Sequence, residues 1–206
     1  YVAAMRSYQE HHQNYFPEFE DAARRYARDQ GWTDGQPPND EAALTAVLKR
    51  QFGYDIDEIP VDKYPSLAAY RMIVQPSGHA GRAFEHAAYD QPGHMRRRPK
   101  LLLNPALMPS QRKFIFAREI GYNVLKLEER ALTNSPDRVE SFAQVLNDFK
   151  AAYFAGALLM PKTRVEHDLH DLFGMKAWHP QRLSQMLADY DVTPETLLYR
   201  FSELVP

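Results

Sequence analysis

The stretch LLLNPALMPSQRKFIFAREIGYNVL, residues 101–125, decides the fold of this 206-residue chain. It begins with an apolar run at 101–103, which predicts a short strand, and then turns at an Asn-Pro pair. We expect Ser110 to cap a helix that continues to about Glu129. Apolar side chains point in nearly every direction from the middle of this helix, and that distribution is typical of a buried helix.

Two charged residues, Arg118 and Glu119, lie in the middle of this apolar helix. A charged side chain is costly to bury unless it is paired. The sequence leaves two interpretations open. Either the pair lies on a narrow exposed stripe, shared with Gln111, Lys126 and Glu129, or it belongs to an internal polar site.

A second segment, DFKAAYFAGALLMP at residues 148–161, belongs to a helix that we expect at 137–160. Its small residues recur four positions apart, as at Ala152 and Gly156, and therefore share one face of the helix. Such a face lets another helix approach closely. Asp148 lies one turn earlier and is expected to point toward the same partner helix.

The rest of the sequence predicts an α+β fold. Capping residues, prolines and glycines predict further helices at 17–31, 40–52, 162–173, 180–188 and 193–204. Short apolar runs predict a small sheet of about three strands, at 72–74, 82–89 and 101–103. Residues 33–40 have the composition of a linker. We therefore expect a helical connector at 1–38 and one larger domain at 39–206.

Composition excludes several classes of protein. The chain has 25 basic and 27 acidic side chains, and this near balance argues against general binding to nucleic acid or anionic membranes. It has no cysteine, so disulfides, thiolate zinc sites and cysteine nucleophiles are excluded. No apolar run approaches the roughly 18 residues that span a bilayer. The chain starts at Tyr1 rather than Met, from which we expect that a preceding part was removed.

Together, the segments at 101–125 and 148–161 resemble the ImmA/IrrE metallopeptidase-like family. The family pattern is a strand ending in Asn-Pro, a helix with an HExxH motif, and a helix with an acidic residue before a small-residue FAxxLLMP run. The resemblance covers about residues 40–206 and implies a zincin-like helical domain with a small sheet. In HExxH, the two histidines bind zinc and the glutamate activates the metal-bound water.

The resemblance places Arg118 at the first histidine, Glu119 at the general base and Tyr122 at the second histidine. Asp148 falls at the position of the acidic ligand, where glutamate is usual. Arginine stays charged and offers no lone pair to a cation. The resemblance therefore implies a pseudo-peptidase without a metal cofactor. We expect Arg118 to pair with Asp148, and Tyr122 to donate its hydroxyl to a carboxylate.

Family members without the zinc ligands resemble the C-terminal part of bacterial transcription regulators. The resemblance thus implies a cytoplasmic, metal-free domain for effector sensing or dimerisation, which reaches DNA only through an upstream helix-turn-helix domain. We expect a homodimer formed through the connector, whose helix carries the aromatic residues Tyr15, Phe16, Phe19 and Tyr26. Two alternatives remain: a zinc metallopeptidase that cleaves a repressor, and an interaction domain without a small ligand.

Among such regulators, the short-chain fatty acyl type is thought to sense acyl-coenzyme A. For that effector we expect an apolar pocket lined by Phe114, Tyr122, Phe149 and Tyr153. We expect the phosphates to lie on the basic run Arg96, Arg97, Arg98 and Lys100. The alternative interpretation of this run is a solvated loop beside an edge strand.

A possible second metal site lies at His167 and His170, three residues apart on one predicted helix face. Acidic residues flank both histidines. The same pattern also fits the solvated side of a short amphipathic helix, so the sequence leaves metal binding there open.

Overall fold

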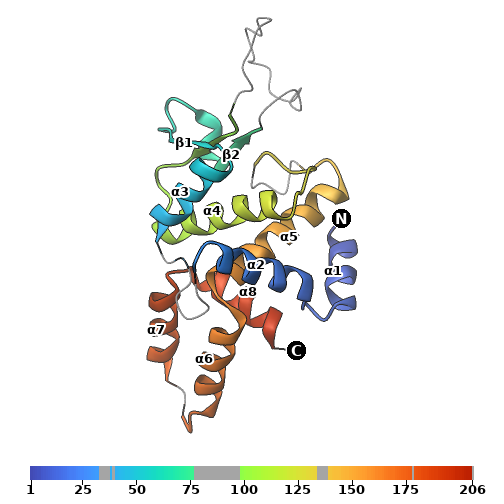
Figure 1. Cartoon of the computed structure of the whole chain (residues 1–206), viewed down its shortest axis with the longest axis vertical. Coiled ribbons are helices and arrows are strands. Elements are labelled where there is room, and N and C mark those ends of the chain that lie inside the picture. The colour runs from blue at the N-terminus through green and yellow to red at the C-terminus, as the bar shows by residue number, and fades with distance from the viewer. Residues whose placement is uncertain (33–37, 39, 77–97, 134–138, 178, 206) are drawn as a thin grey trace, which may run out of the picture.

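The computed structural model describes residues 1–32, 38, 40–76, 98–133, 139–177 and 179–205. Within these ranges it shows a mostly helical chain with one small sheet (Figure 1), which confirms the predicted α+β class. The helices are α1 (Val2–His11), α2 (Pro17–Asp29), α3 (Glu41–Gln51), α4 (Pro109–Val124), α5 (Phe142–Leu159), α6 (Lys162–Gly174), α7 (Pro180–Tyr190) and α8 (Pro194–Leu204), with a 3-10 turn at Pro65–Ala68. The strands are β1 (Asp55–Glu58), β2 (Met72–Gln75) and β3 (Lys100–Leu103).

The sheet has the strand order β1-β3-β2, so β3 is the central strand. It pairs in parallel with β1, with Ile56 opposite Leu101, and antiparallel with β2, with Ile73 opposite Leu102. Successive strand residues face opposite sides of a sheet. Accordingly, Leu101 joins the main core while Leu102 packs in a small separate cluster around Leu67. The sheet is thus buried on both faces at its centre.

The predicted strands at 72–74 and 101–103 are confirmed, whereas the one predicted at 82–89 lies outside the described residues. The third strand that the structure shows is β1, which sequence analysis missed. Its four residues, DIDE, carry three acidic side chains and one apolar residue, Ile56. Because β1 is an edge strand with little apolar surface, its sequence lacks the signal by which strands are recognised.

Helices α4 and α5 cross at the centre of the molecule (Figure 1). Gly121 allows their close approach, because a Cβ atom there would lie 3.0 Å from both the Ala151 carbonyl oxygen and Phe154 Cδ1. Ala151 of α5 thus serves the close contact with α4, whereas Ala152 and Gly156 lie on the side of α5 that lines a cavity next to α8.

Both ends of α4 differ from the prediction. The helix begins at Pro109, with Met108 rather than Ser110 as its N-cap residue, because the proline occupies the first turn. It ends at Val124 instead of Glu129, since Lys126 adopts a left-handed backbone with φ of 53°. The chain therefore turns back along the helix it has just left.

The predicted start of α5 is also wrong. The helix begins at Phe142, and Ser141 caps it by accepting a hydrogen bond from the Gln144 N–H. Asp137, the expected capping residue, lies outside the described residues. In contrast, Asp40 and Thr193 cap α3 and α8 as predicted.

The N-terminal segment packs within the chain itself. Helix α2 lies along α5 (Figure 1), where Phe16 and Phe19 are buried against Tyr153. Ala23 and Ala27 of α2 belong to the main core. Intramolecular burial thus accounts for part of the aromatic content that suggested a dimer contact. The dimer and the division of the chain at residue 38 stay predictions.

A buried lysine of α4, Lys113, fixes the turn that precedes α8. Lys113 is almost completely buried, and its Nζ donates to the Tyr190 carbonyl oxygen at 2.9 Å and to Asp191 Oδ2 at 3.1 Å. Asp191 forms the turn between α7 and α8.

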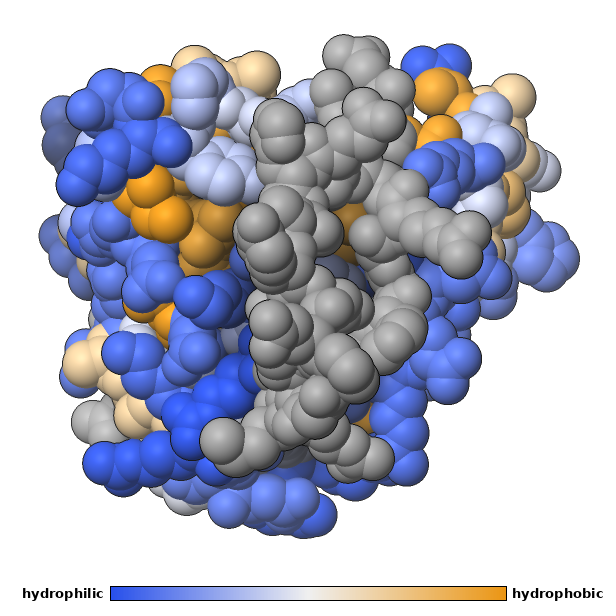
Figure 2. All heavy atoms as spheres, turned by 90° about the horizontal axis from the view of Figure 1, so that it is seen from above, coloured by the Kyte–Doolittle hydropathy of each residue, from blue (hydrophilic) through white to orange (hydrophobic). Residues whose placement is uncertain are grey.

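On the face shown in Figure 2, hydrophilic residues cover most of the described surface, and hydrophobic residues form smaller groups among them. Among the described residues, no helix is both long and apolar enough to cross a bilayer.

Candidate functional site

The carboxylate at the general-base position, Glu119, is completely buried and already paired. Arg130 donates to both of its oxygens, at 2.6 and 2.8 Å, and the Tyr54 hydroxyl donates to one of them at 3.1 Å. Burial alone would raise the pKa of Glu119, but Arg130 and, more weakly, Arg118 outweigh this effect and hold the pKa below its usual value. Glu119 is therefore a charged, structural group at neutral pH.

Arg130 is the partner that sequence analysis missed. It lies eleven residues after Glu119, beyond the end of α4, and reaches back because the chain reverses at Lys126. Its guanidinium carbon also lies 4.1 Å from the centroid of the Tyr122 ring. The contact could not be predicted because it depends on the left-handed turn at Lys126. Such turns are usually recognised by a glycine or an asparagine, and Lys126 is neither.

The side chains of Arg118, Tyr122 and Asp148, at the other three motif positions, meet as the sequence predicts. Arg118 Nη1 lies 3.1 Å from Asp148 Oδ1, and the Tyr122 hydroxyl donates to the same oxygen at 3.1 Å. Burial and then the charge of Asp148 raise the pKa of Tyr122, so its hydroxyl stays protonated and remains a donor. The remaining contact of Arg118 is weak, from Nη2 to the Met72 sulfur at 3.4 Å.

These side chains do not fit a zinc ion. Arg118 brings a positive charge to the position of one ligand, and Tyr122 directs a protonated hydroxyl at the only acidic ligand, Asp148. Glu119 is engaged by Arg130 on both oxygens. Zinc sites require deprotonated donors with free lone pairs. Two arginines and two carboxylates instead form a charge-balanced centre.

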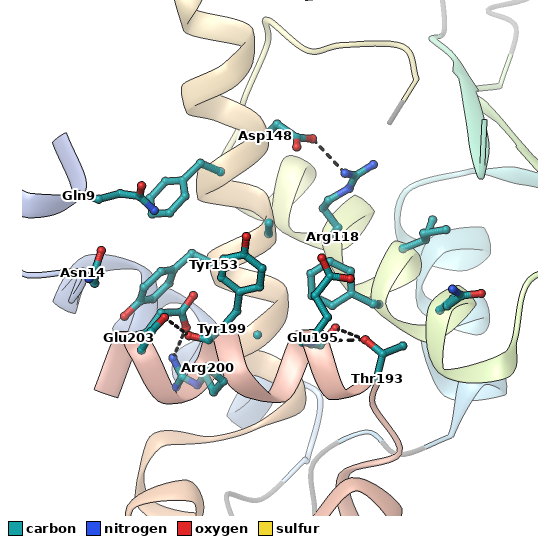
Figure 3. Close-up of a pocket in the computed structure, with 18 of the residues that line it drawn as sticks. Gln9, Asn14, Arg118, Asp148, Tyr153, Thr193, Glu195, Tyr199, Arg200 and Glu203 are labelled. Atoms are coloured by element: carbon teal, nitrogen blue, oxygen red, sulfur yellow. Dashed lines mark hydrogen bonds and ion pairs between the residues drawn. The ribbon is translucent and has the colours of Figure 1, made fainter. Parts of the chain in front are cut away.

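A cavity of about 560 Å³ opens beside this centre, between α1, α4, α5 and α8. Figure 3 shows Arg118 and Asp148 on one side of it and Arg200 and Glu203 on the other. Its aromatic lining residues are Phe114, Phe149, Tyr153 and Tyr199. Three of the four predicted apolar pocket residues thus line one cavity, and the fourth, Tyr122, does not line it. A volume of this size accommodates a small molecule.

The side of this cavity formed by α8 contains a second buried ionic group. Arg200 is almost fully buried and donates to Glu20 at 2.6 and 2.9 Å and to Glu203 at 3.0 Å. The Tyr153 hydroxyl donates to Glu20 as well, at 2.9 Å. Sequence analysis predicted the helix at 193–204 but not this role of Arg200, because nothing in the local pattern relates it to Glu20, which lies 180 residues earlier.

The basic run lies apart from the residues that line the cavity, as far as it is described. Arg98 is exposed and lies 3.9 Å from Asp55 of β1, while Arg96 and Arg97 lie outside the described residues. The described arginines that do line the cavity are Arg71, Arg118 and Arg200. A role of the run in binding phosphates stays a prediction.

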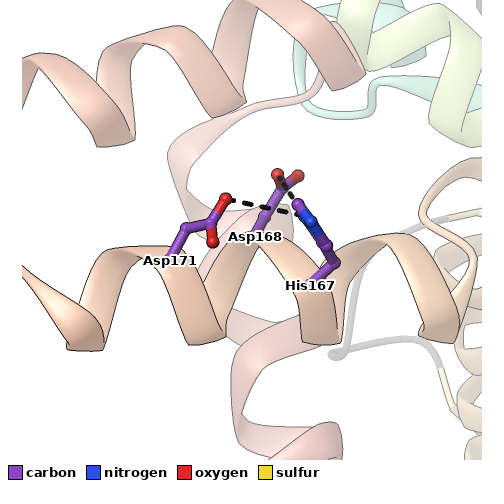
Figure 4. Close-up of side chains that lie close together, drawn as sticks. All are labelled: His167, Asp168 and Asp171. Atoms are coloured by element: carbon purple, nitrogen blue, oxygen red, sulfur yellow. Dashed lines mark ion pairs between the residues drawn. The ribbon is translucent and has the colours of Figure 1, made fainter.

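Of the two histidines on α6, His167 belongs to a cluster with acidic side chains and His170 does not. Ligand atoms of His167, Asp168 and Asp171 lie within 4.8 Å of one another (Figure 4), without His170. However, Asp168 already accepts from Arg182 at 2.6 Å and from the Tyr190 hydroxyl at 2.7 Å. Those bonds give the carboxylate a structural role, and whether a metal binds here stays open.

Comparison with known proteins places this geometry in a family. No curated protein matches the chain. A solved structure of a Mycobacterium tuberculosis transcriptional regulator has a similar fold, with a TM-score of 0.56 and 18% sequence identity. The similarity covers 98% of this chain and 51% of that one, so the chain spans about half the length of that regulator. The family model for the IrrE N-terminal-like domain matches residues 77–202, which contain all four motif positions. The chain therefore belongs to the IrrE N-terminal-like family.

Proposed function

We propose that this chain is a metal-free regulatory domain of a bacterial transcription regulator and that it senses a small effector in the cavity between α4, α5 and α8. The observation that carries the proposal is the arrangement around α4. Arg118 and Asp148 line the cavity where the family places its metal ligands, while Glu119 is turned away and engaged by Arg130. A pocket at this position without a free carboxylate base supports binding of an effector rather than catalysis.

The alternative, a zinc peptidase, requires a carboxylate that can accept a proton from water. Glu119 is held charged by two hydrogen bonds from Arg130, and the cavity lining does not include it. Asp148 does line the cavity, but it is shared by Arg118 and Tyr122. These contacts favour a binding role over peptide hydrolysis.

We propose a short-chain acyl-coenzyme A as the effector. Phe114, Ile115 and Phe149 supply apolar lining for a short acyl chain. Arg71, an exposed residue that lines the same cavity, offers one cation for the phosphates. Arg98 offers another at the surface. Electrostatic contacts of exposed cations weaken with salt, so affinity should fall as ionic strength rises.

Calorimetry with butanoyl-coenzyme A and free coenzyme A tests the effector. The acyl form should bind more tightly, and Ala152→Phe should abolish binding because Ala152 lines the cavity. Phe173→Ala is the matched control, since Phe173 is exposed on α6 and does not line the cavity. Replacing Arg96, Arg97 and Arg98 together with alanine should weaken binding while the domain stays folded. Absence of heat with acyl-coenzyme A at millimolar concentration would exclude this ligand class.

We also propose that the chain acts as a homodimer and contacts DNA only through another domain. Its net charge of -2 is unfavourable for gripping phosphates directly. Two exposed side chains at the start of α1, Tyr1 and Val2, are candidates for the dimer contact. Sedimentation of the chain and of Val2→Asp decides this point: a monomer in both cases contradicts the dimer, and a dimer in both excludes this surface.

A further inference from the structure

The wall of the cavity formed by α8 contains two carboxylates that share one cation. Arg200 uses Nη1 and Nη2 for Glu20, uses Nη1 again for Glu203, and donates from Nε to the Met160 carbonyl oxygen. Every nitrogen of the guanidinium is therefore engaged. Glu203 receives one hydrogen bond, on Oε2, and among the described residues no protein donor reaches its Oε1.

Among the described residues, Arg200 is the cation that contacts both carboxylates of this wall, and Lys162 adds a positive charge near Glu20 but not near Glu203. Glu203 faces Arg200 on its own helix, Glu20 from α2 and Tyr153 from α5. Tyr153 directs its hydroxyl to Glu20 rather than to Glu203. Glu20 thus has two cations near it, whereas Glu203, which lines the cavity, shares only Arg200 among the described residues.

The surroundings of Glu203 are suited to a nitrogen group of a ligand. Figure 3 shows Glu203 beside Arg200 on α8, with Tyr153 and Tyr199 nearby. Aromatic rings attract ammonium groups through their faces, and a carboxylate accepts charge-assisted hydrogen bonds from N–H donors. A carboxylate with a free acceptor oxygen and an aromatic lining occur here in one cavity.

We propose that Glu203 is the specificity-determining residue of this cavity and accepts a hydrogen bond from an N–H group of the ligand. The N–H group is supplied by an ammonium or by an amide, which share this donor chemistry. The inference rests on the proposed role of the cavity as an effector pocket, but it does not depend on the acyl-coenzyme A assignment.

Titration of Glu203 supports the same conclusion. Burial raises its pKa to about 7, and Glu20 adds to this effect while Arg200 opposes it. A carboxyl group with a raised pKa lacks full compensation for its charge. A ligand N–H donor supplies that compensation, so ligand selectivity for such donors should be stronger at pH 8 than at pH 6.

Three probes of matched size test the proposal: 2-phenylethylamine, N-methyl-2-phenylacetamide and methyl phenylacetate. They carry an ammonium, an amide N–H and no N–H donor, respectively. Their dissociation constants are measured at pH 8 by calorimetry on the whole chain. The two N–H donors should bind about tenfold or more tightly than the ester, which is the ratio that a hydrogen bond to a charged group gives.

Three variants identify the acceptor. Glu203→Met should remove the preference for both donors, whereas Glu203→Gln keeps a carbonyl acceptor and should remove only the preference for the ammonium. Glu195→Gln is the matched control, because Glu195 lines the same cavity from the same helix and makes no contact with Arg200 among the described residues. This variant should retain the wild-type preferences. Circular dichroism confirms that each variant is folded.

The outcomes are distinct. Equal binding of donors and ester, a preference that survives in Glu203→Met, or no binding of any probe at millimolar concentration would overturn the proposal. Loss of the preference in Glu195→Gln alone would transfer the role to that residue and overturn it too. Binding of butanoyl-coenzyme A is measured separately, so failure of the acyl-coenzyme A assignment leaves this result unaffected.

Discussion

Replacement of Arg130 by methionine tests whether this residue stabilises the buried centre. Methionine keeps much of the apolar stem but removes two charge-assisted hydrogen bonds, of 2.6 and 2.8 Å, from the fully buried Glu119. Such bonds contribute roughly 1.5–3 kcal/mol each. Leaving one partner of a buried pair alone costs roughly 3–5 kcal/mol. We therefore expect the free energy of unfolding to fall by about 4 kcal/mol.

The loss of stability in Arg130→Met should be larger at high pH than at low pH. In the wild type the pKa of Glu119 is held below its usual value, so its contribution to stability is present above the unfolded pKa and is lost in acid. Without Arg130, burial raises the pKa of Glu119, and the protonated form becomes the favoured one. The variant should therefore lose most stability at pH 8 and less at pH 5.

Urea unfolding at pH 5 and pH 8 measures both effects. Arg98→Met is the control, because the contact between Arg98 and Asp55 is exposed and 3.9 Å long and should contribute about 1 kcal/mol or less. Adding Glu119→Gln to Arg130→Met should restore part of the loss, since it removes the unpaired charge. A cost below about 1 kcal/mol, or one independent of pH, would refute this reasoning.

Three further predictions concern the same core. Because the pKa of Glu203 is raised to about 7, wild-type stability should fall as pH rises from about 4.5 to about 7, and Glu203→Gln should flatten this dependence in urea unfolding. Gly121→Ala should destabilise the chain by about 1–3 kcal/mol, since the added Cβ would meet Ala151 and Phe154; Gly174→Ala, with open space around it, should be neutral in the same thermal unfolding assay. Elemental analysis of protein purified without chelators should find no stoichiometric zinc at Arg118, and zinc that is lost on Glu119→Ala would contradict the metal-free assignment.

Local sequence signals predicted the helices well and the centre only in part. Pro17, Asp40 and Thr193 mark helix starts through their own backbone chemistry, which does not depend on distant parts of the chain. The contact between Arg118 and Asp148 was predictable because the two positions are related by the family pattern. Signals of this kind are short in range or carried by a motif.

The features that escaped prediction depend on tertiary structure. Glu119 and Arg130 meet only because the left-handed residue Lys126 follows the end of α4 at Val124, short of the predicted end at about Glu129. Arg200 and Glu20 come from opposite ends of the chain, and no periodicity relates them. Buried ion pairs of this type form between elements that sequence patterns place independently, so their partners are identified only once the helices are packed.

The buried salt bridge between Arg130 and Glu119 restricts the order in which substitutions at this site can occur. Arg118→His and Tyr122→His together would spell an intact HExxH motif, yet Glu119 would still be engaged on both oxygens. A free catalytic base at Glu119 therefore also requires loss of Arg130. If Arg130 is replaced first, Glu119 is left as a buried charge without its partner. A mutational path to a peptidase would therefore pass through poorly folded intermediates, whereas substitutions in the cavity walls meet no such barrier. The salt bridge between Arg130 and Glu119 thus makes the order of substitutions decisive for any return of a catalytic base.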